Sequence, residues 1–383
     1  MAGMRVLVAP CTFKGSLSAR RAAAAMARGL ASAGLETAEL PLSDGGEGLV
    51  DCFLSLPGTE RIEVGATGPM GRPVRAAYAL MAGAGRGPLT AVIEMAAAAG
   101  LPLVPEPERD PLRATTRGFG EMIGDAARRG ARRLILGIGG SATVDGGCGM
   151  AAALGIRLLD AAGAELPDGG GALERLHRID GRGLDPAVRD LEISVACDVD
   201  SPLLGPTGAA RMFGPQKGAT PEMVERLEAA LARMAERTRL DLDRDVAALP
   251  GTGAAGGLGA GLVAFLGARL VPGADMVMDA LGFDERLRGV GCLLTGEGAL
   301  DVQSLRGKAP VAAARRAARA GVPAVAIAGR SLMGPADALA AGFSHVWELL
   351  ELADAAECML RAEGLMEELS RRHAQEIASL AAR

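Results

Sequence analysis

Residues Met4–Ala9 read MRVLVA, and this short apolar run decides the fold class. Apart from Arg5 the run is apolar, which is typical of a strand that is buried on both faces of a parallel sheet. The loop 10–18, an Ala-rich helix ending near Gly34 and a second predicted strand at Ala38–Leu42 follow it. A strand, a helix and a strand in this order predict a parallel α/β sheet.

The C-terminal part of the chain repeats this alternation. Val290–Leu294 and Val322–Ala328 are predicted strands, with a helix at Ala309–Ala320 between them and a loop, Thr295–Gly298, directly after the first strand. Beyond them we expect a helix near 335–341, a strand around 345–349 and one long amphipathic C-terminal helix. The middle of the chain, roughly 65–288, is less regular and richer in glycine, with structured segments expected at 91–95, 115–129, 133–138, 191–196 and 221–240.

Length and composition exclude several classes of protein. The 383 residues exceed a typical domain of about 100–200 residues, and 23% charged with 49% hydrophobic residues fits a folded globular protein. A net charge of −5 gives no overall basic surface for nucleic acid or an anionic membrane. The six scattered cysteines form no CxxC pair, which indicates a reducing, cytoplasmic setting. The uncharged stretch Val246–Ala268 contains Pro250 and many glycines, so we interpret it as a Gly-rich turn before a buried helix and not as a membrane span.

Glycine-rich segments follow predicted strands or precede predicted helices. Glycine lets backbone N–H groups approach an anion closely, and a following helix N-terminus favours negative charge. Single glycine pairs arise by chance when glycine is 55 of 383 residues. Segments that combine glycine with charged or hydroxyl side chains are more specific, and there are five, namely 13–16 (FKGS), 44–48 (DGGEG), 137–149 (GIGGSATVDGGCG), 213–218 (FGPQKG) and 295–308 (TGEGALDVQSLRGK).

The lysines coincide with these segments. Lys14, Lys217 and Lys308 are the only lysines, each is adjacent to a glycine, and Arg supplies the other cations of the 41. An ammonium is a compact point charge, whereas a guanidinium is a planar fork. We therefore expect anion sites that need the ammonium shape.

There is no Walker motif, and no G-x-G-x-x-G opens a helix after the first strand. The three histidines lie outside the Gly-rich segments, which argues against histidine catalysis and zinc.

Acidic residues accompany the same segments. Asp198 follows the strand-like run 191–197, at the carboxyl end where open α/β sheets bind ligands. Asp198 and Asp200 are two residues apart, so an extended chain puts both on one face. Such a pair would hold Mg²⁺, or one member would accept a hydroxyl proton. Ordinary capping of a turn or helix by either aspartate stays open as the alternative.

Six ordered motifs resemble one family. They are APCTFKGSLSA, PLSDGGEG, GIGGSATVDGG, DVDSPLLG, FGPQKGA and TGEGALDVQSLRGK, and together they look like the bacterial glycerate kinases of the glycerate 2-kinase family. The resemblance implies transfer of the γ-phosphoryl group of ATP to D-glycerate with Mg²⁺, by a cytoplasmic monomer or homodimer. It also implies two α/β domains: a doubly wound parallel-sheet domain formed by residues 1–64 and 289–383, and an inserted Gly-rich α/β domain at 65–288.

The resemblance also suggests roles for particular residues. Asp198, Lys14 and Asp44 are the expected catalytic residues, and Asp198 with Asp200 the expected metal ligands. Ser16, Gly45, Gly46, Glu47 and Lys217 are expected to bind the substrate. The expected nucleotide and phosphate contacts are Gly139, Gly140, Ser141, Thr143, Asp145, Glu297, Asp301 and Lys308.

The chain departs from the family pattern at a few positions. It has Cys11-Thr12 where the family usually has Asp-Ser, and Ser201 where Asn is usual. Two other readings remain open from the residues alone: another phosphate-handling enzyme, such as a phosphosugar isomerase or phosphatase, and a non-catalytic anion-binding protein.

Overall fold

The chain divides into two compact units. A computed structural model describes residues 5–82, 87–301, 304 and 307–382. Unit 1 comprises Met1–Asp44, Asp51–Pro57 and Pro272–Arg383, and unit 2 comprises Gly45–Val50 and Gly58–Val271. The sequence suggested changeovers after residues 64 and 288. The structure has them earlier, because the strand at 59–67 pairs inside unit 2 and the helices at 273–280 and 283–286 pack inside unit 1.

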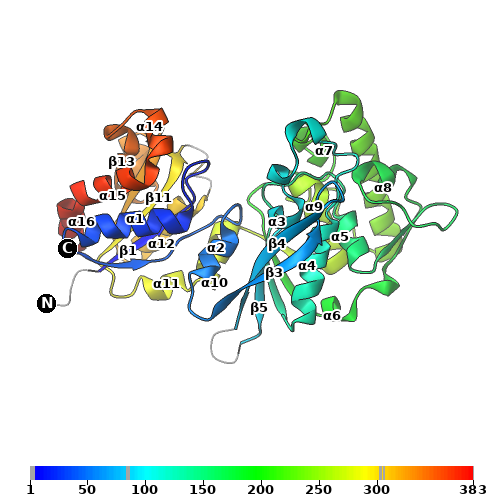
Figure 1. Ribbon diagram of the computed structural model, residues 1–383, viewed down its shortest axis with the longest axis horizontal. Coiled ribbons are helices and arrows are strands. Elements are labelled where there is room, and N and C mark those ends of the chain that lie inside the picture. Colours follow the sequence, from blue (N-terminus) through cyan, green and yellow to red (C-terminus); the bar gives the residue numbers. More distant parts are fainter. Residues whose placement is uncertain (1–4, 83–86, 302–303, 305–306, 383) are drawn as a thin grey trace. The chain divides into compact units, whose positions relative to one another are not determined.

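Unit 1 is built on a parallel sheet with strand order β13-β12-β11-β1-β2 (Figure 1). Every neighbouring pair in this order is parallel. The predicted parallel α/β sheet, with strands from both chain ends, is therefore confirmed. The strands are β1 (Arg5–Pro10), β2 (Glu36–Glu39), β11 (Cys292–Leu300), β12 (Ala324–Ser331) and β13 (Phe343–Glu348).

Helices cover both faces of this sheet. Val6 and Val8 of β1 belong to one apolar cluster with α1 (Ala19–Ala31) and α15 (Ala362–Arg372). Leu7 points to the opposite face, since successive strand residues alternate, and it is also buried. Helix α12 (Ala309–Arg319), which follows β11, contacts β11 and β12. Burial on both faces explains the apolar residues 6–9 of β1 and 324–328 of β12.

Strand β11 is longer than the sequence predicts. The segment Thr295–Gly298, expected to be a loop, continues the strand and pairs with β12, for example Gly296 with Ile327 and Glu297 with Ala328. Glycine permits this pairing, because a Cβ on Gly296 would lie 1.9 Å from the carbonyl oxygen of Ile327. The residue pattern TGEG predicted a turn from its glycines, whereas the glycines serve close approach of two strands.

The C-terminal region also differs from the prediction. Three helices replace the single long helix, namely α14 (Ala355–Leu360), α15 and α16 (Ala374–Ala381). Trp347 of β13 lies between two imidazole rings, with ring centroids 5.8 Å from His345 and 4.2 Å from His373. Glu376 of α16 is 3.0 Å from Nε2 of His345, so this stack ties α16 to the edge of the sheet.

Unit 2 contains a mixed sheet with strand order β10-β9-β6-β5-β4-β3. The strands from β10 to β5 are parallel, and β4 and β3 complete the sheet as an antiparallel hairpin. The predicted strand at 62–64 lies in this hairpin. The bounds are β3 (Thr59–Thr67), β4 (Pro73–Met81), β5 (Thr90–Glu94), β6 (Arg133–Gly137), β9 (Glu192–Ala196) and β10 (Arg269–Val271), with a separate pair β7 (Arg157–Leu159) and β8 (Arg178–Asp180).

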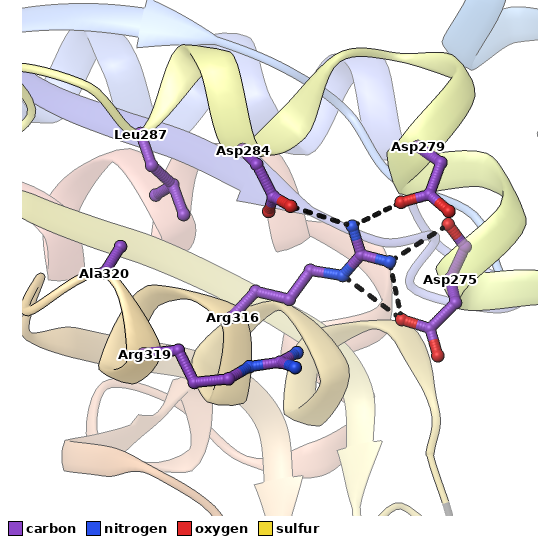
Figure 2. A pocket seen from close by; sticks show the side chains of 7 residues that line it. All are labelled: Asp275, Asp279, Asp284, Leu287, Arg316, Arg319 and Ala320. Carbon is purple, nitrogen blue, oxygen red and sulfur yellow. Dashed lines mark hydrogen bonds and ion pairs between the residues drawn. The ribbon is translucent and has the colours of Figure 1, made fainter.

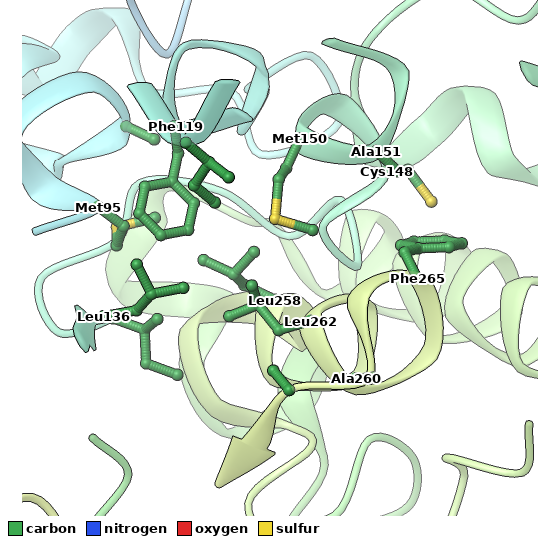
Figure 3. Close-up of a cluster of buried hydrophobic side chains, with 14 of the residues drawn as sticks. Met95, Phe119, Leu136, Cys148, Met150, Ala151, Leu258, Ala260, Leu262 and Phe265 are labelled. Atoms are coloured by element: carbon green, nitrogen blue, oxygen red, sulfur yellow. The ribbon is translucent and has the colours of Figure 1, made fainter. Parts of the chain in front are cut away.

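Small and aliphatic residues form the core of unit 2. Figure 3 shows Leu258 and Leu262 beside Met150, Phe119 and Leu136. Leu258 and Leu262 belong to α9 (Ala254–Leu266), which confirms that the stretch 246–268 ends in a buried helix. No helix among the described residues is long and apolar enough to span a membrane.

The remaining helices connect these strands. Helix α8 starts where Thr220 accepts a hydrogen bond from the backbone N–H of Met223, with Pro221 as its first residue. The bounds of these helices are α2 (Leu49–Leu54), α3 (Ala96–Ala99), α4 (Arg117–Arg128), α5 (Cys148–Ala153), α6 (Pro186–Arg189), α7 (Ala209–Phe213), α8 (Pro221–Leu242), α10 (Gly273–Ala280), α11 (Phe283–Arg286) and α13 (Pro335–Ala340).

Replacing Gly296 by Ala tests the close approach of β11 and β12. We expect Gly296→Ala to lower the free energy of unfolding by about 1–3 kcal/mol, because the new methyl group must displace a strand backbone. Gly65→Ala is the matched control, since Gly65 also lies in a strand but a Cβ there meets nothing within 4 Å. Thermal and denaturant unfolding of both variants decide the point. Equal stability of the two variants would contradict the close approach.

Candidate functional site

The candidate residues of unit 2 gather at the carboxyl ends of its parallel strands. The 137–149 loop follows β6, and Asp198 follows β9, the strand next to β6. Carboxyl ends of parallel strands meet at one edge of the sheet, where open α/β sheets bind ligands. Neighbouring strands therefore bring together two motifs that are about 60 residues apart in the sequence.

The Gly45-Gly46 segment lies against the same edge. A Cβ on Gly45 would be 2.0 Å from Cβ of Ala196, the last residue of β9. A Cβ on Gly137 would be 2.5 Å from the carbonyl oxygen of Gly45, and one on Gly139 would be 3.2 Å from Cα of Gly46. The Gly45-Gly46 segment therefore lies against the start of the 137–149 loop and against the end of β9, which Asp198 follows.

Within the 137–149 loop, exposure changes along the chain. Gly139 and Gly140 are exposed, whereas Ser141, Thr143 and Asp145 are buried. The loop thus presents its glycines to solvent and keeps its polar side chains inside the unit. The expected nucleotide contacts divide accordingly, with the two glycines accessible to a ligand and the three polar side chains enclosed.

Lys217 is enclosed below this loop. Its side chain is only 2% exposed, and Nζ donates to Oγ of Ser141 at 2.6 Å and to the carbonyl oxygen of Thr143 at 2.7 Å. Burial lowers the pKa of the Lys217 ammonium to about 7, and the charge of Asp145 opposes that shift. Lys217 was expected to bind the substrate directly, but its amine is bonded to the loop.

Asp145 holds the loop from another direction. Its carboxylate accepts hydrogen bonds from the backbone N–H and hydroxyl of Thr116, both at 2.8 Å, and from the N–H groups of Gly147 and Gly149. Burial raises the pKa of the Asp145 carboxyl, and these donors oppose the rise. These donors lie at the N-terminal ends of α4 and α5, so the buried Asp145 anchors the loop to both helices and is not open to a ligand.

Asp198 and Asp200 occupy an irregular segment after β9, and both are exposed. Two carboxylates at a strand end are suitable for receiving a proton or for oxygen ligation of a hard cation. Among the described residues, no group of three or more His, Cys, Asp and Glu side chains is arranged to hold a metal ion. A cation at Asp198 and Asp200 would therefore need oxygens from phosphate or water as well.

In unit 1, Lys14 and Ser16 lie in a tight turn between β1 and α1. The turn is closed by paired backbone hydrogen bonds between Phe13 and Leu17, and Ser16 Oγ donates to the carbonyl oxygen of Phe13. Lys14 is exposed and Gly15 has a positive φ of 79°. Ser18 then caps α1 by accepting from the N–H of Arg21. The turn therefore presents Lys14 at the carboxyl end of β1.

Glu297, Asp301 and Lys308 form a charged cluster in unit 1. Lys308 Nζ is 3.6 Å from Oε2 of Glu297 and 4.0 Å from Oδ1 of Asp301. Ser304 donates its hydroxyl to Glu297 and receives the N–H of Asp301, which links the two acids. Burial raises the pKa of the Glu297 carboxyl, and Lys308 opposes this rise. The structure brings these three expected contacts together.

Cys11 is buried in the same part of unit 1. Its N–H donates to the carbonyl oxygen of Gly296 at 2.7 Å. Burial raises the pKa of the Cys11 thiol well above its usual range, and the charges of Glu297 and Asp44 add to the rise. A neutral thiol at this position therefore avoids placing a third negative charge beside two carboxylates.

A separate pocket in unit 1 contains none of the predicted residues among those that line it. Figure 2 shows Arg316 of α12 surrounded by Asp275, Asp279 and Asp284. The Arg316 side chain is 10% exposed, and its nitrogens are 2.8, 2.6 and 3.5 Å from the three carboxylates. The guanidinium and the carboxylates form ion pairs with one another. These pairs tie α12 to α10 and α11, and the pocket is not the candidate site.

Sequence reasoning missed three residues that support the loops. Thr116 joins Asp145 to α5 by accepting the N–H of Met150, Ser304 joins Glu297 to Asp301, and Glu94 accepts the N–H of Val50 at 2.7 Å. Ser304 lies inside a recognised motif, so its hydroxyl was a usable signal. Thr116 and Glu94 lie outside every motif, and only the fold shows their partners.

The fold and these loops define an α/β protein whose Gly-rich and charged loops lie at the carboxyl ends of parallel strands in each unit. A model of the glycerate kinase family matches residues 6–378. The chain is 48% identical to a glycerate kinase of Bacillus subtilis (strain 168) over 328 residues, 85% of each chain. It is 46% identical to a glycerate 2-kinase of Escherichia coli (strain K12) over 329 residues, again 85% of each.

A solved structure agrees with these relatives. The crystal structure of a protein named as a glycerate kinase 2 from Salmonella typhimurium LT2 has a TM-score of 0.86 and 42% identity, and the match covers 98% of this chain and 99% of that one. The chain belongs to the glycerate kinase family. The resemblance that the six motifs indicated is thereby confirmed.

Gly45→Ala tests the contact between the Gly45-Gly46 segment and the end of β9. A Cβ at position 45 would clash with Ala196 and would also sit at a φ of 91°, whereas Gly58 has a similar φ of 77° and open space around it. We expect Gly58→Ala to cost about 1–2 kcal/mol of stability from backbone strain alone. Gly45→Ala should cost about 1–3 kcal/mol more and reduce turnover by about 10²-fold, because the strand end moves. Unfolding and kinase assays on both variants measure this, and matching values would refute the contact.

Proposed function

We propose that the protein transfers the γ-phosphoryl group of ATP to the 2-hydroxyl of D-glycerate, giving 2-phosphoglycerate and ADP. The observation that carries this proposal is 46% identity, over 85% of both chains, to a relative named glycerate 2-kinase. The Gly-rich loops at the strand ends support it, since phosphoryl transfer depends on positioned backbone donors and cations. The cysteine pattern favours a cytoplasmic setting.

We assign the acceptor chemistry to Asp198. Its exposed carboxylate at the end of β9 is suited to take the proton of the substrate hydroxyl as that oxygen attacks phosphorus. Asp198 and Asp200 offer the oxygen ligands that Mg²⁺ prefers, and Mg²⁺ in kinases is usually held by one or two carboxylates together with substrate phosphates. When bound, the ion would neutralise developing charge on the phosphate oxygens.

We assign the binding of the two ligands to the lysines, glycines and acids of the loops. Lys14, with the neighbouring Ser16 hydroxyl, is placed to hold an anionic group of substrate or transferring phosphate. Asp44, Gly45, Gly46 and Glu47 are further residues that we propose as glycerate contacts. Gly139 and Gly140 supply backbone for the nucleotide phosphates, and the cluster of Glu297, Asp301 and Lys308 orders a second nucleotide contact in unit 1.

Product analysis tests the proposed reaction directly. We expect ADP to form only when the protein, ATP, Mg²⁺ and D-glycerate are all present, and we expect the phosphorylated product to be 2-phosphoglycerate, identified by NMR. Formation of 3-phosphoglycerate would overturn the regiochemistry and keep the kinase. Phosphate release without a glycerate requirement would favour a phosphatase, and ATP binding without turnover would favour a non-catalytic protein.

Asp198→Asn tests the proposed base. Asn keeps the size of the side chain but neither takes up a proton nor carries charge, so we expect turnover to fall by at least ~10²-fold with the melting temperature unchanged. Asp190→Asn is the matched control, because Asp190 is also exposed but precedes the other end of β9. Turnover within a few-fold of wild type, together with a lower melting temperature, would show that Asp198 is a structural cap.

A further inference from the structure

We propose that Lys217 is a positioning residue of the 139–145 loop, and that the single buried charge it carries makes phosphate binding at this loop proton-dependent. The inference rests on the proposed function, since it takes the phosphates of ATP as the ligand of the loop. It assigns to Lys217 an indirect role in binding, through the backbone that it holds, and a role in setting the pH range of that binding.

The ammonium of Lys217 is a buried charge without a carboxylate partner. Its two hydrogen bonds go to the Ser141 hydroxyl and the Thr143 carbonyl, both uncharged. Asp145 acts on it through charge alone, and no ion pair of Lys217 occurs among the described residues. Buried charges are normally paired with an opposite charge because their desolvation is costly. An unpaired ammonium below a Gly-rich loop therefore indicates that the counter-charge is a ligand.

Asp145, Arg109 and Arg211 are charged residues on the segments around Lys217. Asp145 acts on Lys217 from the loop before α5, but four donors already surround that carboxylate. Arg109 contacts the next residue, since a Cβ on Gly218 would be 2.9 Å from both Cβ and the carbonyl oxygen of Arg109. In α7, Arg211 is paired with Glu225 of α8 and contributes no unpaired charge. The Asp145 charge is thus already engaged by the loop, and the Lys217 ammonium is a positive charge that an anion at the loop would meet.

The opposite side of the loop is fixed by a left-handed turn at the start of α9. Ala255, Gly256 and Gly257 have φ values of 53°, 70° and 85°. A Cβ on Gly256 would be 1.9 Å from the carbonyl oxygen of Thr143, and the carbonyl of Gly256 accepts the N–H of Gly146. The Thr143 carbonyl is therefore confined between Lys217 and Gly256. Alanine at positive φ costs about 1–2 kcal/mol, and such strain persists where packing fixes one conformation.

The geometry makes the loop a preorganised donor surface. Lys217 and Gly256 fix the backbone around Thr143, Asp145 fixes Gly147 and Gly149, and the exposed ends, Gly139 and Gly140, are left for a ligand. Donors that are held before binding lose no order when a phosphate arrives, which strengthens binding and phosphoryl transfer. Loss of the Lys217 bonds would loosen this surface and also remove the charge below it.

Burial gives the charge a titration within the working pH range. The pKa of Lys217 falls from 10.5 to about 7, so the ammonium is present below this value and is lost as pH rises through it. Phosphate affinity should therefore decrease above pH 7. The free energy of unfolding should instead rise with pH between 7 and 10.5. In this range the unfolded chain binds the Lys217 proton more tightly than the folded chain, and this advantage of the unfolded chain shrinks as pH rises.

Calorimetric titration with ATP across pH 6.5–9 tests the proposal, using wild type, Lys217→Met and Lys217→Arg. We expect Lys217→Met to bind ATP about 10-fold more weakly at the low end, the loss of one hydrogen-bonded charge, and to lose most of the pH dependence that wild type shows. Lys217→Arg keeps a charge at every pH but is too large and planar for the buried position. We expect its turnover to fall about 10²-fold without a pH-dependent change in ATP affinity.

Two further variants separate positioning from stability. Ser141→Ala removes one acceptor and keeps the charge, so ATP binding should weaken a few-fold while its pH dependence stays as in wild type. Arg226→Lys is the control, since Arg226 pairs with Glu174 on the surface of α8, and we expect wild-type binding and turnover. Melting curves of each variant over the same pH range show whether the fold is retained.

The outcomes distinguish this inference from the proposed function. ATP affinity and pH dependence in Lys217→Met equal to those of wild type would overturn the role of Lys217, even if the wild-type enzyme phosphorylates glycerate. If Lys217→Met does not fold, an unaltered Kd for ATP in Ser141→Ala together with wild-type turnover in Lys217→Arg would overturn it equally. Absence of glycerate phosphorylation by wild type would refute the proposed function, while the ATP titrations would still decide whether Lys217 controls an anion site.

Discussion

The buried carboxylate of Asp145 is the interaction on which the loops of unit 2 depend. It is fully enclosed, and its four hydrogen bonds join the first turns of α4 and α5 to the loop that follows β6. A carboxylate in such surroundings is stable as an anion only while these donors stay in place. The donors lie at the N-terminal ends of two helices. Movement of either helix would leave the Asp145 carboxylate with fewer hydrogen bonds, so the loop is held in place.

Both units use the same architectural principle. In each, parallel strands carry the candidate polar groups at their carboxyl ends, and helices cover the apolar faces behind them. Unit 1 presents Lys14 after β1 and the Glu297 cluster on and after β11, whereas unit 2 presents Gly139 and Gly140 after β6 and Asp198 after β9. In each unit the sheet thus supports the loops that carry the candidate site residues.

The apolar strands were the part of the fold most accessible from the sequence. The apolar residues 6–9 and 134–136 lie in β1 and β6, because burial on both faces requires apolar residues. The predicted run 191–196 became β9, with Glu192 exposed at its start. The segment TGEG was assigned to a loop because glycine usually marks a turn, and only the neighbouring carbonyl of Ile327 explains glycine within β11. Local composition does not encode such a long-range contact.

The candidate site was only partly predictable from the sequence. Glycine, lysine and acid motifs identified the correct segments, since these residue types are scarce in combination. The sequence did not distinguish residues that face a ligand from those that hold the loop. Asp145 and Lys217 carry the expected charges, but their burial and partners, including Thr116, come from elements far apart in the chain. Exposure is a property of the whole fold.

The ring stack at the edge of the unit 1 sheet gives the protein a natural optical probe. Trp347 is the only tryptophan, and it lies in unit 1 between His345 and His373. The only tyrosine, Tyr78, is buried in β4 of unit 2. Emission excited selectively at the indole therefore reports the melting of one unit by itself, while circular dichroism records both. Without any label, the difference between the two signals separates the unfolding of the two halves of the enzyme.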